Sequence, residues 1–141
     1  MRSGHTLPEL ITVAAFAAAL TAIAAPRLRE ARDQAIVRDA ATEIVSALDA
    51  TRAAAQRLGT ISIAHFDTLA GTVRVTAEHD TLLVLPFGAE MGVVFDASRD
   101  SVTYGPSGRG YGAANTSLIV RRGSAVDTVF VSRLGRVRRT R

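Results

Sequence analysis

The sequence contains no cysteine, and all 17 of its basic residues are arginine rather than lysine. Without cysteine the chain can form no disulfide, no thiol nucleophile and no cysteine-based zinc site. Its three histidines, His5, His65 and His79, lack the paired spacing of metal ligands. The glycine-rich stretch 105–112 lacks the following helix of a phosphate loop, and no serine sits in a nucleophile elbow. We therefore expect neither an enzyme nor a cofactor or metal site.

Charge is unevenly distributed along the chain. The 17 basic and 13 acidic residues give a net charge of +4. No charge occurs between Leu10 and Ala25, which reads LITVAAFAAALTAIAA. Counted back to His5, this apolar run reaches the ~20 residues that span a bilayer. Its alanines make it a poor anchor but a good surface for close helix packing. Glu9, the one charge in the run, is costly there unless it is paired.

The residues before the apolar run read Gly4-His5-Thr6-Leu7-Pro8-Glu9-Leu10. A secretory signal would place basic residues first and a small-residue cleavage site after the apolar core, which fits poorly here. The order resembles the class III leader of type IV pilins and type II secretion pseudopilins. His5 replaces the usual Phe of that leader, and Pro8 a usual aliphatic residue, although Pro is tolerated in a first helical turn.

The resemblance implies how this segment is processed and used. A prepilin peptidase would cut after Gly4, His5 would become the methylated N-terminus, and the apolar helix would stay on the mature protein. Glu9 would pair with the N-terminal ammonium of a neighbouring subunit, a contact suited to fixing filament register. The protein would be a single-pass protein of the bacterial inner membrane with a periplasmic head, and a filament could extract it.

By themselves, the arginines that flank the apolar run favour a cytoplasmic head, because basic residues collect on the cytoplasmic side of a membrane helix. Only Arg2 precedes the run, whereas Arg27, Arg29 and Arg32 follow it. The orientation therefore rests on the resemblance.

A long helix is expected after the leader. Pro26 predicts either a helix end at the membrane surface or a kink, and the resemblance implies the kink. From Arg27 to Leu58 there is neither Gly nor Pro, and Gly59 supplies a stop. Apolar residues recur there at helical spacing and predict a stripe that packs on a sheet. The stripe comprises Leu28, Ala31, Ala35, Ile36, Ala41, Ile44, Val45, Leu48, Ala55 and Leu58.

The remainder of the chain reads as short strands separated by turns. The expected strands are Thr60–Ala64, Thr72–Ala77, Thr81–Pro86, Gly92–Asp96, Ser101–Tyr104, Ser117–Arg121, Thr128–Val131 and Gly135–Arg138. Phe87-Gly88 reads as a turn, and 105–112 as a loop. Successive strands without intervening helices predict an antiparallel sheet. The fold class is α+β: leader 1–4, membrane or filament-core helix 5–26, amphipathic helix 27–59 and β-rich head 60–141.

The head resembles the GspH/FimT family of minor pilins and pseudopilins in strand order and in its closing Ser132-Arg133-Leu134-Gly135-Arg136-Val137-Arg138. This resemblance implies a structural subunit of a type II secretion pseudopilus or type IV pilus that assembles with other pilins or pseudopilins. An anchored periplasmic domain that never polymerises is a further alternative.

Five arginines close the chain, and they carry the main alternative function. They are Arg133, Arg136, Arg138, Arg139 and Arg141. Strand alternation would place Arg136 and Arg138 outward and Val137 inward, and two guanidinium groups on one face suit phosphates. In the FimT branch Gly-Arg-x-Arg is linked to DNA binding, and here it reads Gly135-Arg136-Val137-Arg138. Since no aromatic accompanies the arginines in sequence, we expect such binding to be non-specific. A solvated terminal strand is the alternative reading.

Overall fold

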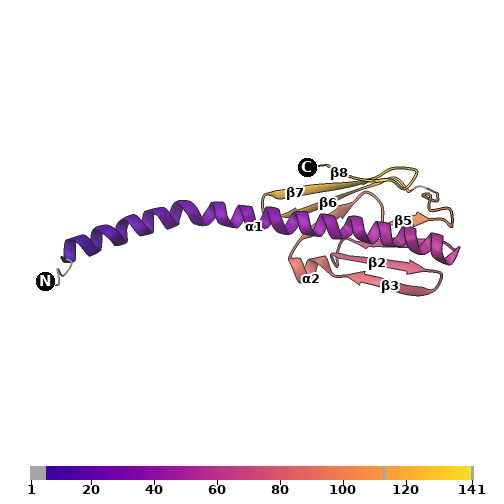
Figure 1. Cartoon of the computed structure of the whole chain (residues 1–141), viewed down its shortest axis with the longest axis horizontal. Coiled ribbons are helices and arrows are strands. Elements are labelled where there is room, and N and C mark those ends of the chain that lie inside the picture. The colour runs from indigo at the N-terminus through magenta and orange to yellow at the C-terminus, as the bar shows by residue number, and fades with distance from the viewer. Residues whose placement is uncertain (1–5, 113, 141) are drawn as a thin grey trace. The chain divides into compact units, whose positions relative to one another are not determined.

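The computed structural model describes residues 6–112 and 114–140. Within them lie a long helix α1 and a short helix α2, together with eight strands (Figure 1). The helices are α1 Leu7–Leu58 and α2 Phe87–Met91; the strands are β1 Ser62–Asp67, β2 Thr72–Ala77, β3 Asp80–Leu85, β4 Val94–Ala97, β5 Ser101–Tyr104, β6 Thr116–Arg122, β7 Ala125–Val131 and β8 Val137–Thr140.

Helix α1 is continuous over 52 residues and runs through Pro26, so the helix does not end at that proline. It ends at Leu58, immediately before Gly59, whose φ of 66° is the left-handed conformation that glycine accepts most readily. The chain divides into two compact units between Arg32 and Asp33, and each contains part of α1.

The first unit holds the apolar part of α1. An 18-residue window there has a mean hydropathy of 1.9, and none of the window is buried. By length and composition this is the one helix among the described residues that could cross a membrane. Its large apolar side chains are exposed: Leu7, Leu10, Ile11, Val13, Phe16, Leu20 and Ile23. A helix with no apolar side chain covered by its own chain needs lipid or neighbouring helices around it.

In the second unit α1 supplies one wall of the core. The buried helix positions are Val37, Ala40, Ala41, Ile44, Ala47, Leu48, Thr51, Ala54 and Ala55. The predicted stripe is right at Ala41, Ile44, Leu48 and Ala55, and Ile36 and Val45 pack partly buried against the core.

The predicted stripe is wrong at its ends, because Leu28, Ala31, Ala35 and Leu58 are exposed. Helical spacing gives a face but not the stretch of helix that the strands cover, and burial begins only at Val37.

The head contains two four-stranded antiparallel sheets instead of the single sheet expected from the sequence. Their strand orders are β3-β2-β1-β5 and β4-β6-β7-β8. The chain leaves one sheet for the other at Ser98–Asp100, because β4 pairs with β6 whereas β5 pairs with β1. Observed strand bounds differ from the expected ones by a few residues, and β8 begins two residues later than predicted.

Helix α2 replaces the turn expected at Phe87-Gly88. It is a five-residue turn of helix between Pro86 and Gly92, too short to show helical periodicity in the sequence. Phe87 is buried and meets Phe95 edge to face, with ring centroids 6.5 Å apart. Arg122 of β6 ties α2 to α1: its Nε donates to Asp33 Oδ1 at 2.8 Å, and a terminal nitrogen donates to the Met91 carbonyl.

The hydrophobic core lies entirely in the second unit. Its largest fully buried side chains are Tyr104, Phe87, Phe95, Ile44, Leu48 and Leu118. Every residue of the core cluster falls between Ile36 and Val137. The segment from Asp33 to Arg141 therefore carries its own core and is suited to measurement as a separate fragment.

Candidate functional site

Glu9 has a structural role within its own chain at the start of α1. Its Oε2 accepts hydrogen bonds from the Thr6 backbone N at 2.8 Å and from Thr6 Oγ1 at 3.0 Å. Thr6 directly precedes the helix, so a carboxylate three residues on satisfies a backbone N–H that the helix cannot, as in a capping box. The Thr-x-x-Glu spacing of Thr6 and Glu9 is a sequence signal of this role, which is not among those expected above. The leader residues Gly4 and His5 lie outside the described residues.

Pro8 fits this helix start without loss. The first backbone bond of α1 runs from Leu10 N to Thr6 O at 3.2 Å, so a residue in the preceding turn has no helical partner for an N–H.

Strand β8 arranges the terminal arginines by alternation. Arg136 and Arg138 are exposed, whereas Val137 between them packs against the core. Arg133 is also exposed, in the turn before β8, and Arg141 lies outside the described residues. Arg133, Arg136 and Arg138 are called the outward arginines below.

Arg139 points the other way and is part of the head's internal structure. Its Nε and one terminal nitrogen donate to Asp127 Oδ2 at 2.7 and 2.5 Å. Its other terminal nitrogen donates to Thr42 Oγ1 of α1 at 2.9 Å. Asp127 is only 4% exposed, so this ion pair is largely withdrawn from solvent. Arg139 therefore joins β8, β7 and α1, while Arg138 next to it stays outside.

Packing requires a glycine at Gly135, the first residue of the Gly-Arg-x-Arg motif. Its φ is 78°, and a Cβ there would lie 2.6 Å from the ring of Tyr104 and 2.9 Å from Gly110 N. The Tyr104 hydroxyl donates to the Gly135 carbonyl at 3.2 Å. Burial, with a smaller contribution from the Asp49 carboxylate, raises the pKa of Tyr104 to about 12. The phenol therefore stays neutral and holds the turn that carries the outward arginines.

The glycine-rich loop is fastened to the same turn. Gly110 N donates to the Leu134 carbonyl at 3.2 Å, and Tyr111 N donates to the Thr103 carbonyl at 2.8 Å. The loop therefore runs along the outer side of β5.

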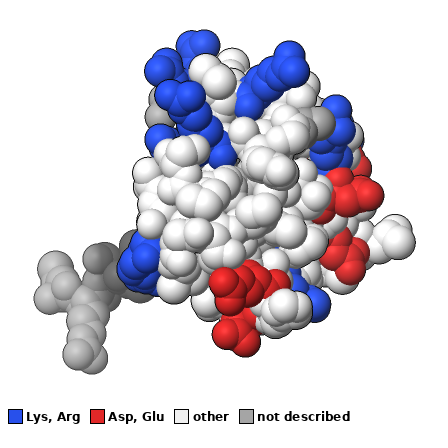
Figure 2. All heavy atoms as spheres, turned by 90° about the vertical axis from the view of Figure 1, so that its right-hand side faces the viewer, with Lys and Arg blue, Asp and Glu red and all other residues white. Residues whose placement is uncertain are grey.

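An aromatic residue does accompany the outward arginines, contrary to the sequence-based expectation. Phe130 of β7 is the cross-strand partner of Arg138 and is 44% exposed. Cross-strand partners share one face of a sheet, so the two side chains are neighbours on the outer face. Phe130 and Arg138 are eight positions apart in the sequence, and only the register of β7 and β8 makes them neighbours. Figure 2 shows basic side chains gathering at the upper rim of one end of the head and acidic ones lower down.

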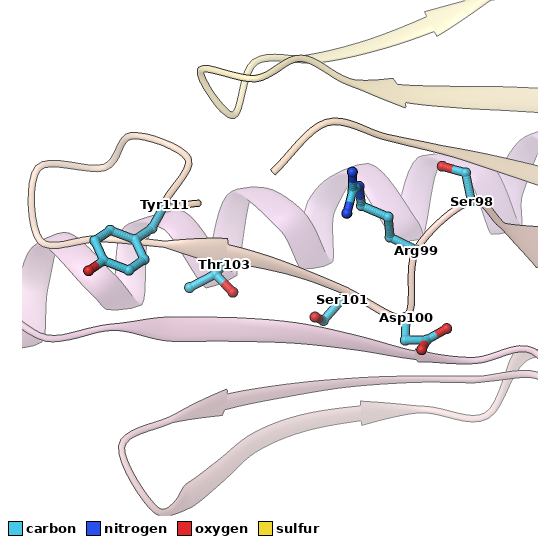
Figure 3. A pocket seen from close by; sticks show the side chains of 6 residues that line it. All are labelled: Ser98, Arg99, Asp100, Ser101, Thr103 and Tyr111. Carbon is cyan, nitrogen blue, oxygen red and sulfur yellow. The ribbon is translucent and has the colours of Figure 1, made fainter. Parts of the chain in front are cut away.

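A shallow polar hollow of about 460 Å³ lies on the outer side of β5 (Figure 3). It is lined by Ser98, Arg99, Asp100, Ser101, Thr103 and Tyr111. Arg99 is held by a bond from its Nε to the Asn115 carbonyl at 3.0 Å. Across residues 6–112 and 114–140, no group of three or more His, Cys, Asp or Glu side chains is placed to hold a metal ion.

Neither a comparison with protein-family models nor a search of curated protein sequences gives a match. Solved structures do match. The type IV minor pilin FimU of Pseudomonas aeruginosa superposes with a TM-score of 0.62 at 13% identity, over 74% of this chain and 88% of FimU. The minor pseudopilin EpsH from the Type 2 Secretion System of Vibrio cholerae superposes with a TM-score of 0.58 at 10% identity, over 74% of this chain and 95% of EpsH.

These likenesses define the fold class. The chain has the α+β fold of type IV minor pilins and minor pseudopilins, with a long N-terminal helix packed on antiparallel sheets.

Proposed function

We propose that this protein is a minor pilin or pseudopilin, a structural subunit of a type II secretion pseudopilus or a type IV pilus. The observation that carries the proposal is that the two parts of α1 have different surroundings. Its first part is apolar and uncovered by its own chain, whereas its second part builds the core of a head with the minor-pilin fold. Residues 1–4 would be a leader, residues 5–26 the membrane or filament-core segment, residues 27–59 an amphipathic helix and residues 60–141 a periplasmic head.

The mechanism would be assembly rather than catalysis. The alanine-rich first part of α1 allows helices of neighbouring subunits to approach closely, and Pro26 would bend it there. Burial between helices removes the exposed leucines and isoleucines from water or lipid, while the head stays outside the bundle. The partners would be other pilin or pseudopilin subunits, a prepilin peptidase and the inner membrane.

Cleavage after Gly4 tests the proposal. In cells that contain a prepilin peptidase, we expect the mature protein to begin at a methylated His5, because Gly4 directly precedes that residue. Mass analysis of the N-terminus of membrane-extracted protein measures this. Gly4→Leu, which alters only the residue before the cut, should leave the leader attached. An intact Met1, or a cut near Ala25 as a signal peptidase would make, contradicts the proposal.

A second function has support from the outward arginines: non-specific DNA binding during DNA uptake. Arg136 and Arg138 are exposed on one side of β8, while the inward Arg139 and Val137 fix the strand. Guanidinium groups so placed can each clamp a backbone phosphate.

The Asp33–Arg141 fragment offers a direct test of this second function. It should bind duplex DNA without sequence preference, with an affinity that falls steeply with salt. Arg136→Gln with Arg138→Gln should lower the slope of log affinity against log salt by about 2, since each phosphate contact contributes about 0.9. Arg99→Gln with Arg109→Gln is the matched control and should change little. Mobility-shift titrations at several salt concentrations suffice. Equal binding by both double variants, or no binding at low salt, rules out this function.

A further inference from the structure

The two sheets leave two well-formed edges open on the head. Strand β3 ends the first sheet and strand β8 ends the second. The opposite edge of the first sheet, β5, is covered by the glycine-rich loop, through the bond from Tyr111 N to the Thr103 carbonyl. The opposite edge of the second sheet, β4, is as short as β8, at four residues, but it carries no basic side chain. An open edge presents unpaired backbone N–H and C=O groups that can hydrogen-bond to another strand.

Strand β3 has little of the usual protection of an edge. Natural edge strands carry lysine, proline, several charges or a β-bulge that discourage pairing, and β3 has only the last of these: a register shift that leaves Leu82 without a partner on β2. Here Leu82, Leu83 and Val84 stand in a row with exposed fractions between 36 and 45%, and Asp80 is the one charged residue of the strand. Such an edge can bind an extended strand through its backbone and its apolar side chains.

The two open edges differ in charge. Strand β3 begins with Asp80, two residues after Glu78, so its start is acidic. Strand β8 carries the exposed Arg138 and follows directly on Arg136. The edges lie on opposite sides of the head, with β8 above α1 and β3 below it in Figure 1. A second copy of the chain therefore brings a basic edge to the acidic, apolar one without either copy having to change its fold.

We propose that β3 of one copy pairs edge to edge, in parallel, with β8 of a second copy, so that the starts of the two strands lie side by side. Backbone hydrogen bonds would join the strands, and Glu78 and Asp80 would face Arg136 and Arg138 of the second copy. Because different surfaces meet, each bound copy leaves one edge of each kind open, and the contact can repeat as an open row of heads. The pairing itself depends only on the two edge strands of the head. Its biological role rests on the proposed subunit function, in which assembly brings heads together.

The natural absence of cysteine makes the pairing measurable in the full-length chain. One population carries Leu82→Cys, the other Thr140→Cys, and the two bear different tags. After mixing in detergent and mild oxidation, we expect mixed disulfide dimers at least tenfold more abundant than those from Val126→Cys mixed with Thr140→Cys. Val126 is the matched control because it is an exposed aliphatic residue on the central strand β7. Equal yields from the two mixtures overturn the proposal.

Charge reversal gives a second, independent readout. Glu78→Arg with Asp80→Arg in the Leu82→Cys chain should lower the mixed-dimer yield at least tenfold. Arg136→Glu with Arg138→Glu in the Thr140→Cys chain should restore it, provided thermal melts show both variants folded. Absence of rescue, or crosslinks in cells from Leu82→Cys only to a different protein, contradicts pairing between copies. The mixing uses neither DNA nor filaments, so its failure is separable from failure of the proposed subunit function.

Discussion

Replacing Asp127 by Ala is expected to destabilise the head by about 3–5 kcal/mol, the usual cost of removing one partner of a buried ion pair. Asp127 Oδ2 accepts two hydrogen bonds from Arg139, and Oδ1 accepts a third from Thr128 N at 2.8 Å. Without the carboxylate the guanidinium of Arg139 remains between β7 and α1 with only Thr42 to bind. Urea unfolding of the Asp33–Arg141 fragment measures the change in the free energy of unfolding.

Asp96→Ala is the matched control for this prediction. Asp96 also pairs with an arginine of a neighbouring strand, Arg121, at 3.2 Å, but the two side chains are 59 and 51% exposed. An exposed pair contributes about 0–1 kcal/mol, so this variant should barely change stability. Similar losses in the free energy of unfolding for Asp96→Ala and Asp127→Ala would show that burial does not explain how much the Arg139–Asp127 pair contributes to stability.

Replacing Glu9 should produce the largest effect on assembly. Glu9→Ala removes both the charge and the acceptor for Thr6, whereas Glu9→Gln keeps an acceptor of nearly the same shape. If the Glu9 carboxylate neutralises a neighbour's ammonium, both variants should reduce crosslinking to other pilins at least tenfold, about 1.4 kcal/mol. Both should remain in the membrane, because losing a charge eases insertion.

Comparing Glu9→Gln with Glu9→Ala distinguishes a role of Glu9 in filament register from a role in capping α1. If Glu9 only caps its own helix, Glu9→Gln should assemble like the wild type while Glu9→Ala does not. Thr6→Ala is the companion control, since it removes the hydroxyl donor and keeps both the backbone donor and the carboxylate. Wild-type crosslinking by Glu9→Gln would rule out the register role.

The sequence predicts the helix and most of the strands because their signals are local. Gly59 marks the end of α1, and runs of β-branched residues mark strands such as β2 and β5. The partners of each strand are not local. Nothing near Ser98–Asp100 indicates that β4 and β5 belong to different sheets, since that depends on strands tens of residues away.

The candidate sites show the same limit at single residues. Alternation correctly predicts that Val137 packs inward and that Arg136 and Arg138 face solvent. It treats Arg139 as one more cation of the terminal cluster, because its partner Asp127 lies on a strand whose register the sequence does not reveal. The pairing of Phe130 with Arg138 depends on the same register.

The bond from Arg139 to Thr42 joins residues 97 positions apart, and the bond from Tyr104 to Gly135 joins residues 31 apart. Both bonds therefore form only once β8 and the turn before it have been made, after the seven other strands. The core wall formed by α1 is made first but stays uncovered on the β7–β8 side until then. If the head is exported across the membrane, β8 must cross before the head can close. Closure of the core would then follow the transport of β8 instead of accompanying the transport of the earlier strands.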